Sequence, residues 1–97
     1  MAVVELSRAA RVDLHGIYEY SIENFGLEVA GKYLADVQNA LMRLSDFPSL
    51  GSPASDLKPG MRCLPCRQHR IFYHHDAKTV HIGRILHQAM DPRRWLD

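Results

Sequence analysis

The chain has 97 residues, of which 46% are hydrophobic and 24% are charged. These proportions are typical of one globular domain spanning residues 1–97, and they exclude an intrinsically disordered chain. No apolar run approaches the ~18 residues of a membrane span, and the N-terminus lacks the pattern of a secretory signal. We therefore expect a cytoplasmic protein with no membrane partner.

The charge of the chain is small overall but unevenly distributed. A formal net charge of +1 is low for a nucleic-acid-binding domain, so we expect no direct sequence-specific binding of nucleic acid. Residues 1–60 carry five basic and eight acidic side chains, whereas residues 61–97 carry seven basic and three acidic ones. This asymmetry predicts two partner surfaces of opposite sign.

The first half of the chain predicts one strand and two helices. Val3–Leu6 is a short β-branched run that favours a strand, and Ser7 is a suitable N-cap for the helix that follows. Gly26 is placed to end this helix, and the second helix must end before Pro48. Because so few residues separate them, the helices should form an antiparallel hairpin. The positions that we expect to pack on a sheet are Leu14, Ile17, Leu34, Val37 and Leu41.

The second half of the chain predicts a sheet. Residues 48–60 are rich in turn-forming residues. After them, a period of two predicts three strands, at Met61–Pro65, Gln68–His75 and Thr79–His87. Asp91 followed by Pro92 predicts a terminal helical turn. The order β-α-α-β-β-β predicts an α+β fold, with a two-helix antiparallel hairpin packed on a small, mainly antiparallel sheet.

The cysteines and the paired histidines invite a chemical interpretation that the predicted elements do not support. Cys63 and Cys66 have CxxC spacing, but a redox pair needs a helix N-terminus, whereas these residues lie on a predicted strand. We expect both thiols to be reduced and without a catalytic role. His74 and His75 are neighbours on a strand and should point to opposite faces. The sequence therefore predicts no metal site and no cofactor.

Arg84 shares the apolar parity of its predicted strand, and two interpretations are open. Either Arg84 is a buried or cleft arginine with a partner, or Gly83 forms a bulge that shifts the parity. Arg84 and His87 together could bind a phosphate and cleave RNA by acid–base chemistry. No tyrosine or lysine follows Lys78 to complete such a set, so the spacing is weak evidence for catalysis.

Several motifs in combination resemble those of a known family. A second helix ending in "DFP" at 46–48 is followed by Arg62 at the start of a strand, by "HRIFY" at 69–73 and by "VHIGRILHQAMD" at 80–91. Together with the order of elements, this resembles a ParE-type toxin of the RelE/ParE superfamily of bacterial toxin–antitoxin modules. The resemblance extends from residue 1 to the end of the chain.

The resemblance implies a function that composition alone does not. It implies the toxin of a type II module that inhibits DNA gyrase, with no enzymatic activity and no cofactor. It also implies a hetero-oligomer with a ParD-like antitoxin, a ribbon-helix-helix protein. One alternative is a RelE-like ribosome-dependent mRNA endonuclease, which the low net charge disfavours. Another is an inactive toxin fold that binds the antitoxin as a corepressor.

Two candidate surfaces follow from these expectations. The mildly acidic helical layer has apolar positions outside its core stripes, which suits an antitoxin tail that folds on binding. The candidate antitoxin-binding residues are Tyr18, Tyr20, Ile22 and Tyr33. The basic C-terminal third contains the residue types most enriched at interfaces. The candidate gyrase-binding residues are Arg84, His87, Met90, Arg93, Arg94 and Trp95. The alternative for Trp95 is that it packs onto the sheet and closes the core.

Overall fold

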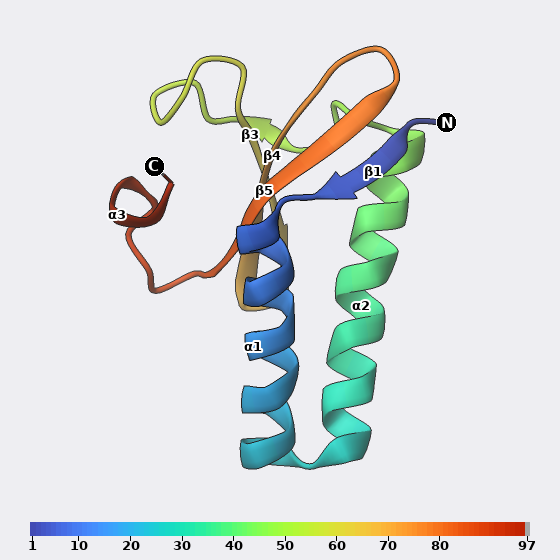
Figure 1. Ribbon diagram of the computed structural model, residues 1–97, viewed down its shortest axis with the longest axis vertical. Coiled ribbons are helices and arrows are strands. Elements are labelled where there is room, and N and C mark those ends of the chain that lie inside the picture. The colour runs from blue at the N-terminus through green and yellow to red at the C-terminus, as the bar shows by residue number, and fades with distance from the viewer. Residues whose placement is uncertain (97) are drawn as a thin grey trace.

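The computed structural model describes residues 1–96, in which a helical hairpin packs on one face of a sheet and projects beyond its edge (Figure 1). The predicted α+β architecture is confirmed. No helix in the described residues is long and apolar enough to cross a membrane. The elements are β1 (Val3–Leu6), α1 (Arg8–Phe25), α2 (Leu27–Asp46), β2 (Ser52–Pro53), β3 (Arg62–Cys66), β4 (His69–His75), β5 (Thr79–His87) and α3 (Pro92–Trp95).

The sheet is mixed, with strand order β1-β5-β4-β3-β2. Strands β3, β4 and β5 are joined by antiparallel pairing, as predicted, but β1 runs parallel to β5. The two-residue strand β2 lies in the segment 48–60, which the sequence predicts to be turns only, and it pairs with the start of β3. The β1–β5 pairing joins segments far apart in the chain, which local patterns do not encode, whereas β2 is a pairing of only two residues with the nearby start of β3.

Local signals set the bounds of the helices. The Ser7 side chain accepts a hydrogen bond from Ala10 N–H at 3.0 Å and so caps α1 as predicted. Gly26 is the single residue between α1 and α2, and its φ of 87° is a conformation that favours glycine. Its N–H donates to the Ile22 carbonyl, and its own carbonyl accepts from Ala30 N–H. One glycine therefore ends the first helix and begins the second.

The main core lies between the helices and the sheet. Ile17, Val37 and Leu41 are buried there, in agreement with the predicted stripes. Leu14 is half-buried against this core. The prediction for Leu34 is wrong, because this side chain is only half-buried and lines a shallow groove on the outside of the hairpin. Leu44, with 0% exposure, occupies the interior position instead.

A second, smaller cluster covers the opposite face of the sheet. Its buried members are Ala54, Met61, Phe72, Leu86 and Leu96. They come from two strands, from the segment that precedes β3 and from the end of the chain. The sequence predicts a single helical layer on one face. In the structure, a loop and the C-terminal segment close the other face.

A bulge in β5 sets which of its residues face each cluster. Phe72 pairs with Arg84, and Tyr73 pairs with Ile82, so Gly83 has no partner across the strand pair. Because of this extra residue, Ile85 joins the main core while Leu86 faces the outer cluster. The bulge, one of the two interpretations that the sequence left open, is therefore present, and it removes Arg84 from the apolar face that simple alternation gives it.

Candidate functional site

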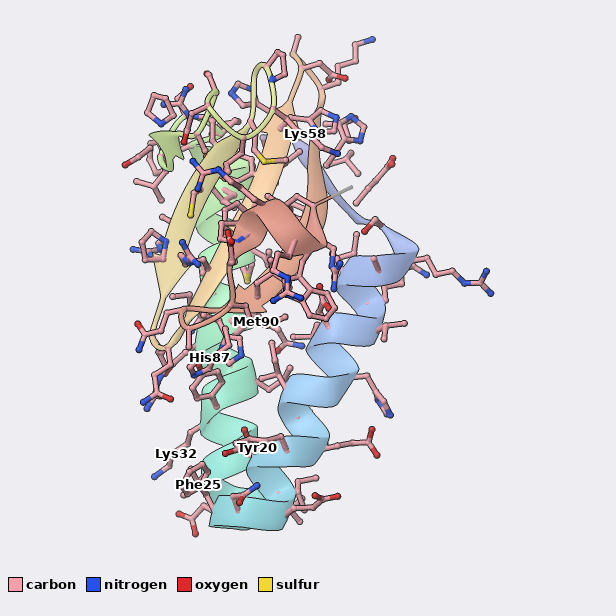
Figure 2. The ribbon with its side chains drawn as sticks, turned by 90° about the vertical axis from the view of Figure 1, so that its left-hand side faces the viewer. Tyr20, Phe25, Lys32, Lys58, His87 and Met90 are labelled. Atoms are coloured by element: carbon pink, nitrogen blue, oxygen red, sulfur yellow. The ribbon has the colours of Figure 1, made fainter. Side chains whose placement is uncertain are left out.

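A groove of about 760 Å³ lies between the helical hairpin and the ends of β4 and β5. Figure 2 shows Tyr20 and Phe25 along its helical part, with His87 and Met90 nearer the sheet. Its volume is within the usual range for binding clefts, about 300–1,000 Å³. Both helices contribute to its lining. The lining residues from α1 are Val12, Asp13, Gly16, Ile17, Tyr20, Ser21 and Phe25, and those from α2 are Val29 and Tyr33, which are four residues apart.

The helical part of the groove exposes large apolar side chains to solvent. Tyr20 is 62% exposed, Phe25 is 61% exposed and Val29 is 46% exposed. The Tyr20 and Phe25 rings meet edge to face, with centroids 6.5 Å apart. A contiguous exposed apolar patch of this kind is typical of a protein–protein interaction site. The arrangement suits the apolar face of an amphipathic partner segment.

The inner end of the groove is polar. The Tyr33 hydroxyl oxygen lies 2.5 Å from His69 Nδ1 and accepts a hydrogen bond from Gln68 N–H at 3.2 Å. The rings of His69 and His87 meet edge to face, with centroids 5.2 Å apart. The Arg67 guanidinium lies 4.8 Å from the centre of the Tyr33 ring. Three aromatic rings and one cation therefore close this end of the groove.

Burial controls the protonation of these groups. It lowers the pKa of His69 to about 4, and the nearby His87 lowers this pKa as well, while Asp13 acts in the opposite direction. Burial also raises the pKa of the Tyr33 hydroxyl. At neutral pH, His69 is therefore an uncharged ring, and its Nδ1 shares a hydrogen bond with the Tyr33 hydroxyl. This end of the groove can stack against a partner or form hydrogen bonds with it.

The C-terminal segment, residues 88–96, is bound to the sheet through its backbone. Arg70 on β4 donates a hydrogen bond to the Met90 carbonyl at 2.8 Å, and Arg84 on β5 donates to the Trp95 carbonyl at 2.7 Å. Asp91 accepts from Arg93 N–H and begins the short helix α3, as predicted. The segment is therefore held in place at several points along its length.

The candidate antitoxin-binding residues do not all lie together. Tyr20 and Tyr33 share the groove described above. Tyr18 lines the separate shallow groove outside the hairpin, and Ile22 is half-buried and lines neither groove. The groove also contains Phe25 and Val29, which the sequence prediction missed. Val29 lies four residues before Tyr33 on α2, a spacing that could have revealed it, whereas Phe25 ends α1 before the break at Gly26 and shares no helical period with them.

The candidate gyrase-binding residues have different degrees of exposure. Arg93, Arg94 and Trp95 are exposed, whereas His87 and Met90 are half-buried and line the groove. Trp95 is 46% exposed, and Leu96 is the side chain that packs into the outer cluster.

Arg84 has the partner that the sequence left open. Its side chain is 22% exposed and forms an ion pair with the Asp13 carboxylate, which is 12% exposed. The hydrogen bond with Asp13 raises the pKa of Arg84, while burial acts in the opposite direction. Both interpretations of this residue therefore hold, because Arg84 has a partner and also follows a bulge.

The sheet separates the two cysteines from each other. Cys66 packs in the main core, whereas Cys63 packs against the outer cluster, so the two thiols lie on opposite faces. Burial raises the pKa of both thiols, which favours the unreactive protonated form. His74 stacks on His81 of β5, with ring centroids 4.8 Å apart. Among residues 1–96, no group of three or more potential ligands is arranged to hold a metal ion.

Solved structures with the same architecture define the class of protein. A chain of the chromosomal ParDE toxin–antitoxin system from P. aeruginosa matches with a TM-score of 0.77 and 25% identity. The match covers 90% of this chain and 96% of that one. A chain of the RelBE2 toxin–antitoxin complex from Mycobacterium tuberculosis matches with a TM-score of 0.67 and 26% identity, covering 89% and 96%. The fold is that of the RelE/ParE toxins.

Sequence comparisons place the chain within this class. The family described as "ParE toxin of type II toxin-antitoxin system, parDE" matches residues 4–92. Toxin ParE1 of Caulobacter vibrioides is 34% identical over 96 residues, which are 99% of each chain. Toxin ParE1 of Mycobacterium tuberculosis is 33% identical over 90 residues, which are 92% of each chain. This protein belongs to the ParE toxin family of type II toxin–antitoxin systems.

Proposed function

We propose that this protein acts in the cytoplasm as a non-enzymatic toxin that inhibits DNA gyrase and is neutralised by a ParD-like antitoxin. The observation that carries this proposal is the match to the ParE toxin family over residues 4–92. The antitoxin would contain a ribbon-helix-helix DNA-binding part and a tail that folds on the toxin. Toxin and antitoxin would then form a hetero-oligomer.

The groove is the proposed site for the antitoxin tail. Its helical part exposes Tyr20, Phe25 and Val29, which would otherwise remain in contact with water. An amphipathic tail that places apolar residues at helical spacing would cover this row of side chains. Aromatic anchors such as Tyr20 contribute much of the binding energy in interfaces of this kind. The solved ParDE and RelBE2 complexes have the same toxin fold, which supports an antitoxin partner here.

The C-terminal segment is the proposed site for gyrase. Arg93, Arg94 and Trp95 are exposed there on a segment whose backbone is bound to the sheet. Exposed arginine and tryptophan side chains are common binding hot spots. His87 and Met90 lie at the boundary between this segment and the groove. A tail seated in the groove would therefore lie next to the proposed target-binding surface.

The arrangement of the strand arginines supports inhibition by binding over RNA cleavage. Arg84 is engaged by Asp13, and Arg70 by the Met90 carbonyl. Arg62 donates to the carbonyl of Gly51 at 2.8 Å. A nuclease needs such cations to be available for a phosphate. The net charge of +1 also gives little attraction to ribosomal RNA.

Two assays run in parallel test this proposal. In the first, purified protein is added to gyrase and relaxed plasmid, and supercoiling is measured. In the second, it is added to translating ribosomes, and mRNA cleavage is mapped. The proposal predicts inhibition of supercoiling, intact mRNA and reversal by the antitoxin encoded beside the toxin. Cleaved mRNA with normal supercoiling would establish the RelE-like alternative, and activity in neither assay would favour a corepressor.

A further inference from the structure

Arg84 connects three parts of the molecule through one guanidinium group. Its Nε and Nη2 donate to the two carboxylate oxygens of Asp13 on α1, each at 2.8 Å. Its Nη1 donates to the carbonyl of Trp95 at 2.7 Å. The planar guanidinium fixes these three hydrogen bonds in one geometry, which a lysine cannot reproduce. Helix α1, strand β5 and the C-terminal segment therefore meet at this residue.

Asp13 holds this guanidinium in a fixed orientation. One of its oxygens, Oδ2, also accepts a hydrogen bond from the Ile85 N–H at 3.0 Å. Because β1 pairs with β5 only as far as Ile82, this part of β5 has no neighbouring strand on that side, and Asp13 supplies the acceptor instead. The Asp13 carboxylate thus binds both the backbone N–H of Ile85 and the side chain of Arg84 on β5. Such a bidentate, largely buried pair is well ordered compared with an exposed one.

The C-terminal segment is bound by its backbone while the side chains of Arg93, Arg94 and Trp95 remain exposed. The carbonyls of Met90 and Trp95 accept from strand arginines, and Leu96 is buried beyond them. Between these points, the side chains of Arg93 and Arg94 are exposed. This arrangement presents several interface-type side chains on a backbone that is already ordered. Ordering before binding reduces the entropy that association costs.

We propose that Arg84, oriented by Asp13, is a positioning residue for target binding: it fixes the C-terminal segment so that Arg93, Arg94 and Trp95 are presented in one arrangement. This rests on the proposed function, in which that segment contacts gyrase. Arg84 itself faces Asp13 and the Trp95 carbonyl, so it acts through the segment and not by contact with the target. The residue differs in this respect from the exposed arginines of α3.

Trp95 allows the positioning to be measured without gyrase, because it is the only tryptophan of the chain. The variant to use is the double substitution Asp13→Asn/Arg84→Gln, which leaves the net charge unchanged and no buried charge unpaired. The control is Arg62→Gln, since Arg62 is also a strand arginine that holds loop carbonyls, those of Gly51 and Ser49. Both variants are compared with the wild type well below their melting temperatures.

The first readout is quenching of Trp95 fluorescence by acrylamide. Because Trp95 is 46% exposed when the segment is bound, its release should increase quenching by up to about twofold in the double variant. The second readout is inhibition of supercoiling, which should weaken by about tenfold because two or three side chains must then be ordered on binding. Arg62→Gln should leave both readouts unchanged even if it lowers the melting temperature.

The outcomes separate this inference from the function on which it rests. Increased quenching together with weaker inhibition in the double variant alone supports the positioning role. Unchanged quenching, or increased quenching with undiminished inhibition, overturns it. A similar loss of inhibition in Arg62→Gln also overturns it, because the effect would then follow from general destabilisation. Wild-type protein that leaves supercoiling unaffected overturns the proposed function itself.

Discussion

The two faces of the sheet are closed in different ways. The helical face is covered by two long helices, whose buried side chains include Val37 and Leu44 at 0% exposure. The outer face is covered by a loop and by the end of the chain, with Leu96 as the last buried side chain. The main core is therefore large and continuous, whereas the outer cluster depends on a few residues. Stability should reside mainly on the first face, and target binding on the second.

The largest expected effect comes from the helical face. Leu44→Ala should lower the free energy of unfolding by about 3–5 kcal/mol, because it removes a fully buried side chain and leaves a cavity. Leu34→Ala is the matched control on the same helix. It should cost less than about 1 kcal/mol, since Leu34 is only half-buried on the outside of the hairpin. Equal losses measured by urea unfolding would contradict the assignment of the two positions.

The outer cluster should respond less strongly. Leu96→Ala should cost about 2–3 kcal/mol, because Leu96 is 7% exposed in a cluster that is small and near a chain end. Leu50→Ala, at a leucine that is 44% exposed, serves as the control and should cost less than about 0.5 kcal/mol. If thermal melting shows no difference between the two variants, the outer face is not closed in the way described.

Changes in the groove should affect binding and leave stability nearly unchanged. The double variant Tyr20→Ala/Phe25→Ala should weaken antitoxin binding by about 10–100-fold, as expected for loss of two aromatic anchors. Both side chains are more than half exposed, so the melting temperature should change little. Met42→Ala, at an exposed position outside the groove, is the control. Calorimetry that gives wild-type affinity for the double variant would exclude the groove as the antitoxin site.

Acidification should destabilise the protein through His69, the half-buried histidine at the inner end of the groove. Burial lowers the pKa of His69 to about 4 in the folded protein, compared with about 6.5 when unfolded. The unfolded state therefore binds more protons between these values, so this residue makes stability rise with pH from about 4 to 6.5. After allowance for solvent screening at a half-buried ring, the effect is about 1–2 kcal/mol. His69→Gln should remove this part of the pH dependence, whereas exposed His15→Gln should not.

Much of the fold follows from local patterns. The period of the apolar residues predicted both helices and the three long strands, and Ser7, Gly26 and Asp91 marked the helix ends. These signals succeed because caps and amphipathic stripes act within a few residues. The parallel pairing of β1 with β5 and the short strand β2 were not predictable in the same way. The first arises from contacts between segments far apart in the chain, and the second is a two-residue pairing within a segment rich in turn-forming residues.

Less of the candidate site than of the fold could be predicted from the sequence. Arg84 and Asp13 are 71 positions apart, so no local pattern connects them. The bulge at Gly83 was one of two readings that simple alternation could not separate. By contrast, the four-residue spacing of Val29 and Tyr33 on α2 was present in the sequence. Finding it would have required a search for a second apolar face on a helix whose first face already explains the core.

The most direct measurement of the division between the two surfaces compares one aromatic residue from each. Tyr20 lies in the groove and Trp95 lies on the C-terminal segment, and each is replaced by alanine. The quantity to measure is the toxin concentration that halves gyrase supercoiling, without antitoxin. We expect Tyr20→Ala to match the wild type and Trp95→Ala to require about tenfold more protein, as for loss of a binding hot spot. The reverse pattern, with Tyr20→Ala impaired and Trp95→Ala unaffected, would contradict the assignment of gyrase to the C-terminal segment.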